Sequence, residues 1–106
     1  MKYIENIQDF ENLTKNEVVV VDFYADWCGP CRMLTPVIEN LVNQYSDNSR
    51  VAIAKLDVDK IGAVAAKYGV NSIPTIIFFK NGSEFGRAIG YKPLQYFVDI
   101  VNKMLA

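Results

Sequence analysis

The run from Val18 to Tyr24 restricts the fold of this chain more than any other stretch of its sequence. Its residues are β-branched or aromatic and apolar at almost every position, which is typical of a strand covered on both faces. Such a strand lies inside a sheet with helices packed on both sides. Asp22 is the exception within the run. Because burial disfavours the charged form of a carboxyl group, we expect the pKa of Asp22 to be raised.

Further strands and helices are indicated along the rest of the chain. Strands are expected near residues 1–4, 51–58, 75–80 and 84–89, and helices near residues 7–16, 33–45, 61–68 and 93–105. The Asn81-Gly82 pair is a strong hairpin signal, so the last two strands should run antiparallel. Pro36 interrupts the second helical pattern, and we expect a kinked helix there.

The order of these elements, β-α-β-α-β-α-β-β-α, predicts an α/β fold. Strand–helix–strand units give parallel pairing, and the hairpin adds an antiparallel edge to a mixed central sheet with helices on both faces. At 106 residues the chain is expected to form one domain, residues 1–106. Since 51% of its residues are hydrophobic, it should fold without a metal or a structural disulfide.

Composition argues against several classes of protein. The formal net charge is −1 with acidic and basic residues interspersed, which is unlike the basic stripe of a nucleic-acid-binding protein. No apolar run approaches the ~20 residues that span a membrane, and the first residues lack the apolar core of a signal peptide. We therefore expect a cytoplasmic protein, monomeric by default, that binds neither nucleic acid nor a membrane. In that compartment a cysteine pair is more often catalytic or metal-binding than structural.

The two cysteines of the chain, Cys28 and Cys31, form a Cys-x-x-Cys motif, and the chain has no histidine. A Cys/His zinc site needs four ligands, so only a carboxylate-rich or intermolecular site would remain. Covalent haem attachment would need a histidine where Arg32 stands. An iron–sulfur cluster held by four thiolates would need two chains. We therefore expect no metal site. Redox chemistry remains, with a pair of buried, inert cysteines as the alternative.

The spacing of the cysteines suits a redox-active disulfide. At i and i+3 of a helix start, Cys28 and Cys31 lie on one side about 5–6 Å apart, the span that a disulfide requires. Cys28, ahead of the helix, has the more exposed position. The helix dipole favours its thiolate, and we expect its pKa to be about 7. Cys28 should therefore attack, and Cys31 should resolve the mixed disulfide. Gly29 would let a partner backbone come close, and Pro30 would stiffen the first turn.

Asp22 and Lys55 are the other candidate catalytic residues. Asp22 lies near the end of the strand that delivers the cysteines, and we expect it to act as a general base or acid for Cys31, directly or through a water. Lys55 lies in the second buried strand, where it is a candidate charge partner of Asp22. The alternative is a strand-end aspartate that points to solvent and a lysine on the surface.

Four segments of the sequence resemble the thioredoxin family, in the family's order and along essentially the whole chain. They are the active-site segment Val20–Cys31 with its buried aspartate, the lysine-bearing strand Ala54–Asp59, the proline-bearing segment Tyr68–Thr75 and the hairpin Phe79–Gly82. The resemblance implies the thioredoxin fold, a central five-stranded mixed β-sheet flanked by four helices. It implies a cytosolic reductant of protein disulfides with no bound cofactor beyond its redox-active disulfide, re-reduced by a thioredoxin reductase that draws on NADPH.

By the same resemblance, Pro74 is cis and lies beside the cysteines. The substrate chain would lie in a groove, and the backbone of Ile73 would pair with it. The groove residues that the resemblance implies are Trp27, Gly29, Pro30, Ile73, Pro74 and Gly90. Ordinary packing and turn geometry are the alternatives for Trp27 and Pro74. Tyr24 departs from the family pattern, which often has tryptophan at that position.

A dithiol reductant is the leading hypothesis for the function. Gly29 and Pro30 between the cysteines resemble the reducing members of the family, whereas oxidising relatives commonly carry a histidine there. An oxidase or isomerase is the alternative within the same chemistry. A binding module in which the thiols are incidental is the alternative of a different class.

Overall fold

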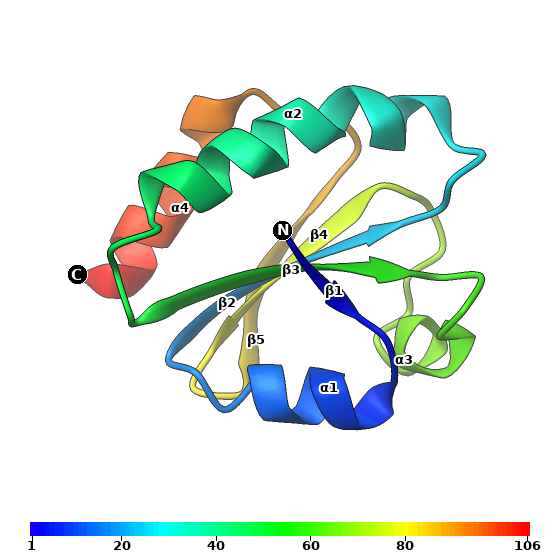
Figure 1. Cartoon of the computed structure of the whole chain (residues 1–106), viewed down its shortest axis with the longest axis horizontal. Helices are drawn as coiled ribbons and strands as arrows, with labels where there is room; N and C mark the ends of the chain where they lie inside the picture. The colour runs from blue at the N-terminus through cyan, green and yellow to red at the C-terminus, as the bar shows by residue number, and fades with distance from the viewer.

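The computed structural model describes all residues from 1 to 106 and contains five strands and four helices (Figure 1). In chain order they are β1 (Lys2–Ile4), α1 (Ile7–Leu13), β2 (Val18–Tyr24), α2 (Gly29–Gln44), β3 (Val51–Asp57), α3 (Gly62–Lys67), β4 (Thr75–Lys80), β5 (Ser83–Ile89) and α4 (Leu94–Leu105). The predicted order of elements is confirmed. None of the helices combines the length and the apolar character that a membrane span needs.

The strands form one mixed sheet in the order β1-β3-β2-β4-β5. Strands β1 and β2 run parallel to β3, whereas β4 runs antiparallel to β2 and β5 antiparallel to β4. Strand β2 therefore lies at the centre of the sheet with a partner along each edge, as its apolar composition predicts. The expected fold class, a five-stranded mixed sheet with four helices, is confirmed.

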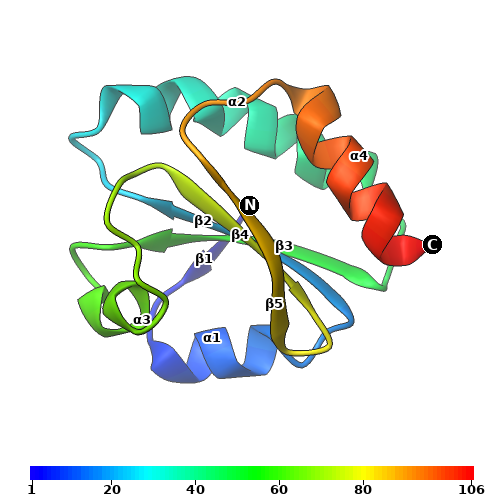
Figure 2. The same ribbon diagram turned by 180° about the vertical axis from the view of Figure 1, so that it is seen from behind.

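Helices α1 and α3 cover one face of the sheet, and α2 and α4 cover the other (Figure 1, Figure 2). Since successive side chains of a strand point to opposite faces, β2 contributes to both cores. Val19 and Val21 pack in the core that contains α1 and α3, whereas Val18 and Val20 pack in the core that contains α2 and α4. The same alternation places Asp22 on the α2 side of the sheet.

Cap and turn residues begin and end the elements as their chemistry predicts. The side-chain oxygen of Asn6 accepts a hydrogen bond from the N–H of Asp9 at 2.8 Å and so caps α1. Asn81 and Gly82 have φ angles of 50° and 85°, the positive values that a tight two-residue hairpin requires. Helices α1 and α3 are both shorter than their patterns predict, and α3 is followed by Gly69 in the left-handed region, with φ of 64°.

Helix α2 begins where the cysteine spacing places its start, ahead of Met33, the first residue of its apolar periodicity. Its first residue is Gly29, because Pro30 suits the first turn and Cys28 provides the N-cap. The helix continues through Pro36 as a single element. The cysteines therefore lie at the N-terminus of a long helix.

The edge strand β5 contains a bulge. Its pairing with β4 shifts between Phe78 and Phe79, and this shift leaves Phe85 without a partner residue. Nearby, the guanidinium of Arg87 lies 2.7 Å from the carboxylate of Glu84. Arg87 also donates to the carbonyl oxygen of Tyr68 at 2.8 Å. The edge is therefore irregular and carries a charged pair.

A charge cluster fastens the end of α4 to the sheet. The carboxylate of Glu17 lies 2.6 Å from both Arg50 and Lys80. The hydrogen bond from Arg50, and to a lesser extent that from Lys80, lowers the pKa of Glu17 to about 2. The same two cations donate to the carbonyl oxygens of Leu105 and Met104, respectively. Cations at a helix C-terminus satisfy its free carbonyl groups and complement its dipole.

Phe78 should be a major contributor to stability. It is fully buried, and its ring centroid lies 6.2 Å from that of Phe97 on α4. Because truncation leaves a cavity between the sheet and α4, Phe78→Ala should lower the free energy of unfolding by about 3–5 kcal/mol in denaturant titrations. Phe85→Ala is the matched control: its side chain is 52% exposed, and it should change stability by less than about 0.5 kcal/mol. Equal losses in both variants would contradict the assignment.

Candidate functional site

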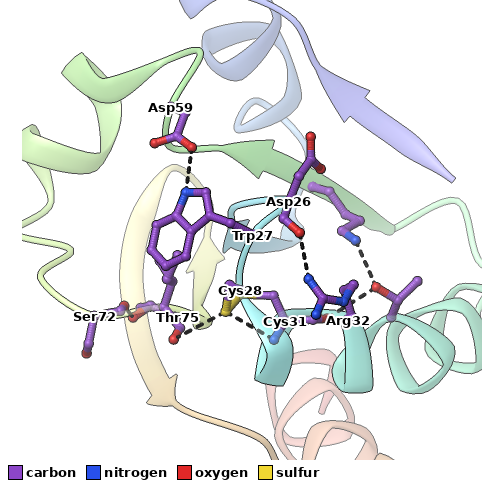
Figure 3. The surroundings of a disulfide bond; sticks show 11 residues. Asp26, Trp27, Cys28, Cys31, Arg32, Asp59, Ser72 and Thr75 are labelled. Atoms are coloured by element: carbon purple, nitrogen blue, oxygen red, sulfur yellow. Dashed lines mark hydrogen bonds between the residues drawn. A yellow bond between two sulfur atoms is a disulfide. The ribbon is translucent and has the colours of Figure 1, made fainter.

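Cys28 and Cys31 form a disulfide where β2 gives way to α2 (Figure 3). Cys28 is the N-cap residue of α2, and Cys31 lies in its first turn. Their Cα atoms are 5.2 Å apart, in agreement with the distance expected from helical spacing. The predicted pairing of the two cysteines is confirmed.

Backbone groups surround the sulfur of Cys28. The N–H of Cys31 donates to it at 3.2 Å, and the carbonyl oxygen of Ile73 lies 3.8 Å away (Figure 3). When the disulfide is opened, this N–H and the positive end of the α2 dipole both favour a thiolate at Cys28. Cys28 is 5% exposed and Cys31 2%, so the difference in exposure is small, because Ala25 and Ile73 pack against the pair.

Two loops meet beside the disulfide. The peptide bond between Ile73 and Pro74 is cis, as the resemblance implies. Ile73 is half-buried against the cysteines, and Pro74 is buried. The N–H of Gly90 donates to the carbonyl oxygen of Pro74 at 2.8 Å. Gly90 has a φ of 87°, a conformation that favours glycine. The structure thus brings Ile73, Pro74 and Gly90 together next to Cys28.

Trp27 lies on the surface in a fixed orientation. Its side chain is 69% exposed, and its indole N–H donates to a carboxylate oxygen of Asp59 at 2.9 Å (Figure 3). The following residues also reach the surface, since Gly29 is half-buried and Pro30 is exposed. An oriented aromatic ring beside a reactive bond offers apolar contact area to a partner without a large loss of conformational freedom.

Asp22 is fully buried, and neither of its carboxylate oxygens has a hydrogen-bond partner. Burial raises the pKa of Asp22 to about 7, and the positive charge of Lys55 opposes this shift. The prediction of a raised pKa is confirmed, and the alternative of a solvent-facing aspartate is wrong. A carboxyl group with this pKa can accept or give up a proton near neutral pH.

Lys55 stands opposite Asp22 in the pairing of β2 with β3 and is 5% exposed, so it is not a surface lysine. The expected ion pair with Asp22 is nevertheless absent. The ammonium of Lys55 donates instead to the hydroxyl of Thr35 at 3.2 Å and lies 4.3 Å from the ring centroid of Tyr24. These two contacts replace the carboxylate as its partners. Lys55 therefore acts on Asp22 through its charge alone.

A small pocket of about 120 Å³ opens beside these groups. It is lined by Tyr24, Ala25, Asp26, Cys31, Arg32, Thr35 and Lys55. On its exposed side, the guanidinium of Arg32 donates to the carbonyl oxygen of Asp26 at 2.9 Å (Figure 3). The volume and the polar lining suit water molecules next to Cys31. Nowhere in the structure do three or more His, Cys, Asp or Glu side chains gather as metal ligands would.

No sequence motif singles out Thr35, Asp59 or Arg32 as site residues, although two of them carry a recognisable signal. Thr35 follows Cys31 by one helical turn, so it lies on the same side of α2. Asp59 follows the end of β3, and the carboxyl ends of parallel strands meet at one edge of a sheet. Arg32 follows Cys31 directly, and its bond to a backbone carbonyl has no counterpart in a sequence pattern.

A disulfide at the N-terminus of the helix that follows the central strand, with a cis-proline loop against its sulfur, defines a thiol–disulfide oxidoreductase. Comparison with known proteins agrees. The family model for thioredoxin matches residues 2–103. The chain belongs to the thioredoxin family, and the activity that goes with this family and its disulfide is that of a protein-disulfide reductase.

Relatives and solved structures cover nearly the whole chain. The thioredoxin of Chlamydia pneumoniae is 41% identical over 103 residues, which are 97% of this chain and 98% of that protein. The thioredoxin of Staphylococcus epidermidis is 42% identical over 97 residues, which are 92% of this chain and 91% of that protein. A mutant thioredoxin from Halobacterium salinarum matches with a TM-score of 0.87 at 36% identity, over 97% of this chain and 88% of that one.

Asp22→Asn should remove a pH dependence of stability. The folded-state pKa of about 7 lies above the ordinary value of 3.8, so the folded protein holds a proton that the unfolded chain has lost. This stabilisation is complete below about pH 4 and is lost as the pH rises through about 7, a difference on the order of 4 kcal/mol. Denaturant unfolding of the oxidised protein should show the decline in the wild type and a flat profile in D22N between about pH 5 and 8, above the range in which Glu17 titrates.

Asp99→Asn is the matched control, because Asp99 lies exposed on α4. It should keep the decline of the wild type. A D22N variant that still loses stability between about pH 5 and 8 would show that another group is responsible.

Proposed function

We propose that this protein reduces substrate disulfides through a mixed-disulfide intermediate in which Cys28 attacks and Cys31 resolves. The thiolate of Cys28 attacks one sulfur of the substrate disulfide, forms a new S–S bond to it and releases the other substrate sulfur as a thiolate. Cys31 then loses its proton and attacks the sulfur of Cys28. This step forms the Cys28–Cys31 disulfide and releases the second substrate thiolate, so two electrons pass to the substrate.

The observation that carries this assignment is the position of Cys28 at the N-terminus of α2, with the N–H of Cys31 3.2 Å from its sulfur. These groups favour the thiolate of Cys28 over that of Cys31. Cys31 lies in the first turn of the helix, and its own N–H is directed at the sulfur of Cys28. Its sulfur is therefore better placed for the intramolecular second step than for attack on a bulky substrate.

Asp22 accepts the proton of Cys31 in the second step. Its burial on the α2 side of the sheet, its lack of hydrogen-bond partners and its pKa of about 7 all support this role. Water in the pocket beside Cys31 and Lys55 would connect the thiol to solvent. The charge of Lys55 keeps the pKa of Asp22 from rising further and so supports the same transfer.

Disulfide-containing proteins bind at the surface around the disulfide. Trp27, Gly29 and Pro30 form one side of this groove, and Ile73, Pro74 and Gly90 form the other. The carbonyl oxygen of Ile73 lies 3.8 Å from the sulfur of Cys28, which supports pairing of an extended substrate segment with this backbone. A substrate bound in this way would present its own disulfide to Cys28.

A thioredoxin reductase returns the Cys28–Cys31 disulfide to the dithiol with electrons from NADPH. The protein works in the cytoplasm as a monomer of one domain, residues 1–106, and uses no bound metal or cofactor, because the disulfide itself carries the electrons. The similarity to bacterial thioredoxins at 41% and 42% identity supports this setting.

Replacing Cys28 and replacing Cys31 should block the reduction of substrate disulfides at different steps. With dithiothreitol as the electron source, the wild type should accelerate the reduction of insulin disulfides, and Cys28→Ser should not. Cys31→Ser should attack but not resolve, so it should accumulate a mixed disulfide that mass spectrometry detects as a covalent adduct. Trapping by the Cys28 variant instead would reverse the assignment. An inactive wild type would refute the proposed function.

Asp22→Asn should slow the second step at neutral pH and leave the first unchanged. An amide cannot accept the proton of Cys31, and general-base catalysis typically contributes about a hundredfold or more. Single-turnover experiments should show normal formation of the mixed disulfide and slow release of the substrate. The difference in release rate between the wild type and D22N should become smaller at alkaline pH, where Cys31 ionises without a general base. Equal release rates in both proteins at pH 7 would rule out the role of Asp22.

A further inference from the structure

The ammonium of Lys55 is held by groups other than the carboxylate that faces it. Asp22 and Lys55 stand opposite each other on adjacent parallel strands, which lie about 4.8 Å apart, and both side chains belong to the same face of the sheet. A lysine in this position is long enough to pair with the carboxylate. Neither oxygen of Asp22 has a hydrogen-bond partner, however. Other contacts must therefore hold Lys55 away.

Thr35 supplies the main contact. Its hydroxyl donates to the carbonyl oxygen of Cys31, one turn earlier in α2, at 3.2 Å. With its hydrogen directed to that carbonyl, the Thr35 oxygen is left to accept, and the ammonium of Lys55 donates to it at 3.2 Å. The ring of Tyr24, 4.3 Å from the same nitrogen, gives a second, weaker contact. Thr35 thus links Lys55 to the backbone of the resolving cysteine.

We propose that Thr35 is a positioning residue: its hydroxyl holds the Lys55 ammonium away from Asp22 and so leaves the Asp22 carboxyl free to exchange a proton with Cys31. This inference rests on the proposed role of Asp22 and adds to it the group that sets the distance between the two charges.

Electrostatics gives the direction of the effect. If the ammonium moved from Thr35 onto Asp22, opposite charges would meet in a region that excludes water, and the carboxylate form would be favoured. An opposite charge in direct contact typically lowers a carboxyl pKa by about 1–3 units. An Asp22 so stabilised would be a weaker proton acceptor at neutral pH. The hydroxyl of Thr35 therefore keeps Asp22 in its working range.

The titratable and charged groups around Asp22 are few. Strand β4 places the apolar Ile76 opposite it, and α4 contributes only apolar side chains to the buried core on this face. The remaining groups come from β2, β3, α2 and the rim of the pocket, and they are Tyr24, Lys55, Asp57, Cys31, Asp26 and Arg32. Lys55 is the buried cation of this set, since Arg32 is exposed.

The test is a titration of Asp22 in variants of Thr35. Thr35→Val removes the hydroxyl and keeps the branched shape, whereas Thr35→Ser keeps the hydroxyl. Carboxyl carbon NMR shifts of Asp22 are followed against pH in the oxidised protein, in which neither cysteine titrates. The midpoint should fall by about 1 pH unit or more in the valine variant and stay in place in the serine variant. The pH profile of substrate release should move to lower pH in the same variant.

Lys55→Met provides the second arm, because the ammonium is the group that is expected to move. In that background Thr35→Val should leave the Asp22 midpoint unchanged. An unmoved midpoint in the single valine variant, or a shift that persists without Lys55, would overturn the proposal. Thr35→Ala replaces the valine variant if that one does not fold. These titrations need no catalysis, so they can fail while D22N still slows substrate release, and the two hypotheses are separated.

Discussion

Strand β2 is buried on both faces and paired with a neighbouring strand along each edge, and the rest of the molecule depends on this arrangement. The four residues Val18–Val21 have no exposed surface, so they gain the full hydrophobic free energy of burial. Helices must cover both faces to provide that burial, and β3 and β4 must satisfy the backbone groups. The carboxyl group of Asp22 lies in this strand at a cost in stability. Its retention there fits a functional rather than a structural need.

The reactive disulfide lies where the burial of β2 ends. At that point the chain turns into α2, whose first N–H groups have no partner within the helix and can serve the sulfur of Cys28. The loops after β3, before β4 and after β5 arrive at the same edge of the sheet, and they bring Asp59, Ile73 and Gly90. The sheet therefore gathers the site, whereas the chemistry belongs to the loops and the helix terminus.

The central strand, the hairpin and the placement of the cysteines could be predicted because each depends on neighbours in the sequence. Val18–Val21 are apolar on both alternating faces, and Asn81 and Gly82 tolerate positive φ. The raised pKa of Asp22 followed from its burial alone. The partner of Lys55 could not be predicted in the same way. The long side chain of a lysine can reach several acceptors, and its partner here, the hydroxyl of Thr35, comes from α2, which is distant from β3 in the sequence. The start of α2 at Gly29 could be predicted from the cysteine spacing and Pro30, although the apolar face of the helix begins only at Met33.

The bulge in β5 has a consequence for the behaviour of the protein at high concentration. An edge strand presents unpaired N–H and C=O groups, to which a strand of another molecule can add, and long runs of such pairing lead to aggregates. In β5 the row of groups is broken at Phe85, and the charged pair of Glu84 and Arg87 lies beside the break. A second chain could pair with this edge over only a few residues. The opposite edge strand, β1, is only three residues long and offers little pairing surface. Both edges of the sheet therefore disfavour the addition of a strand from another molecule.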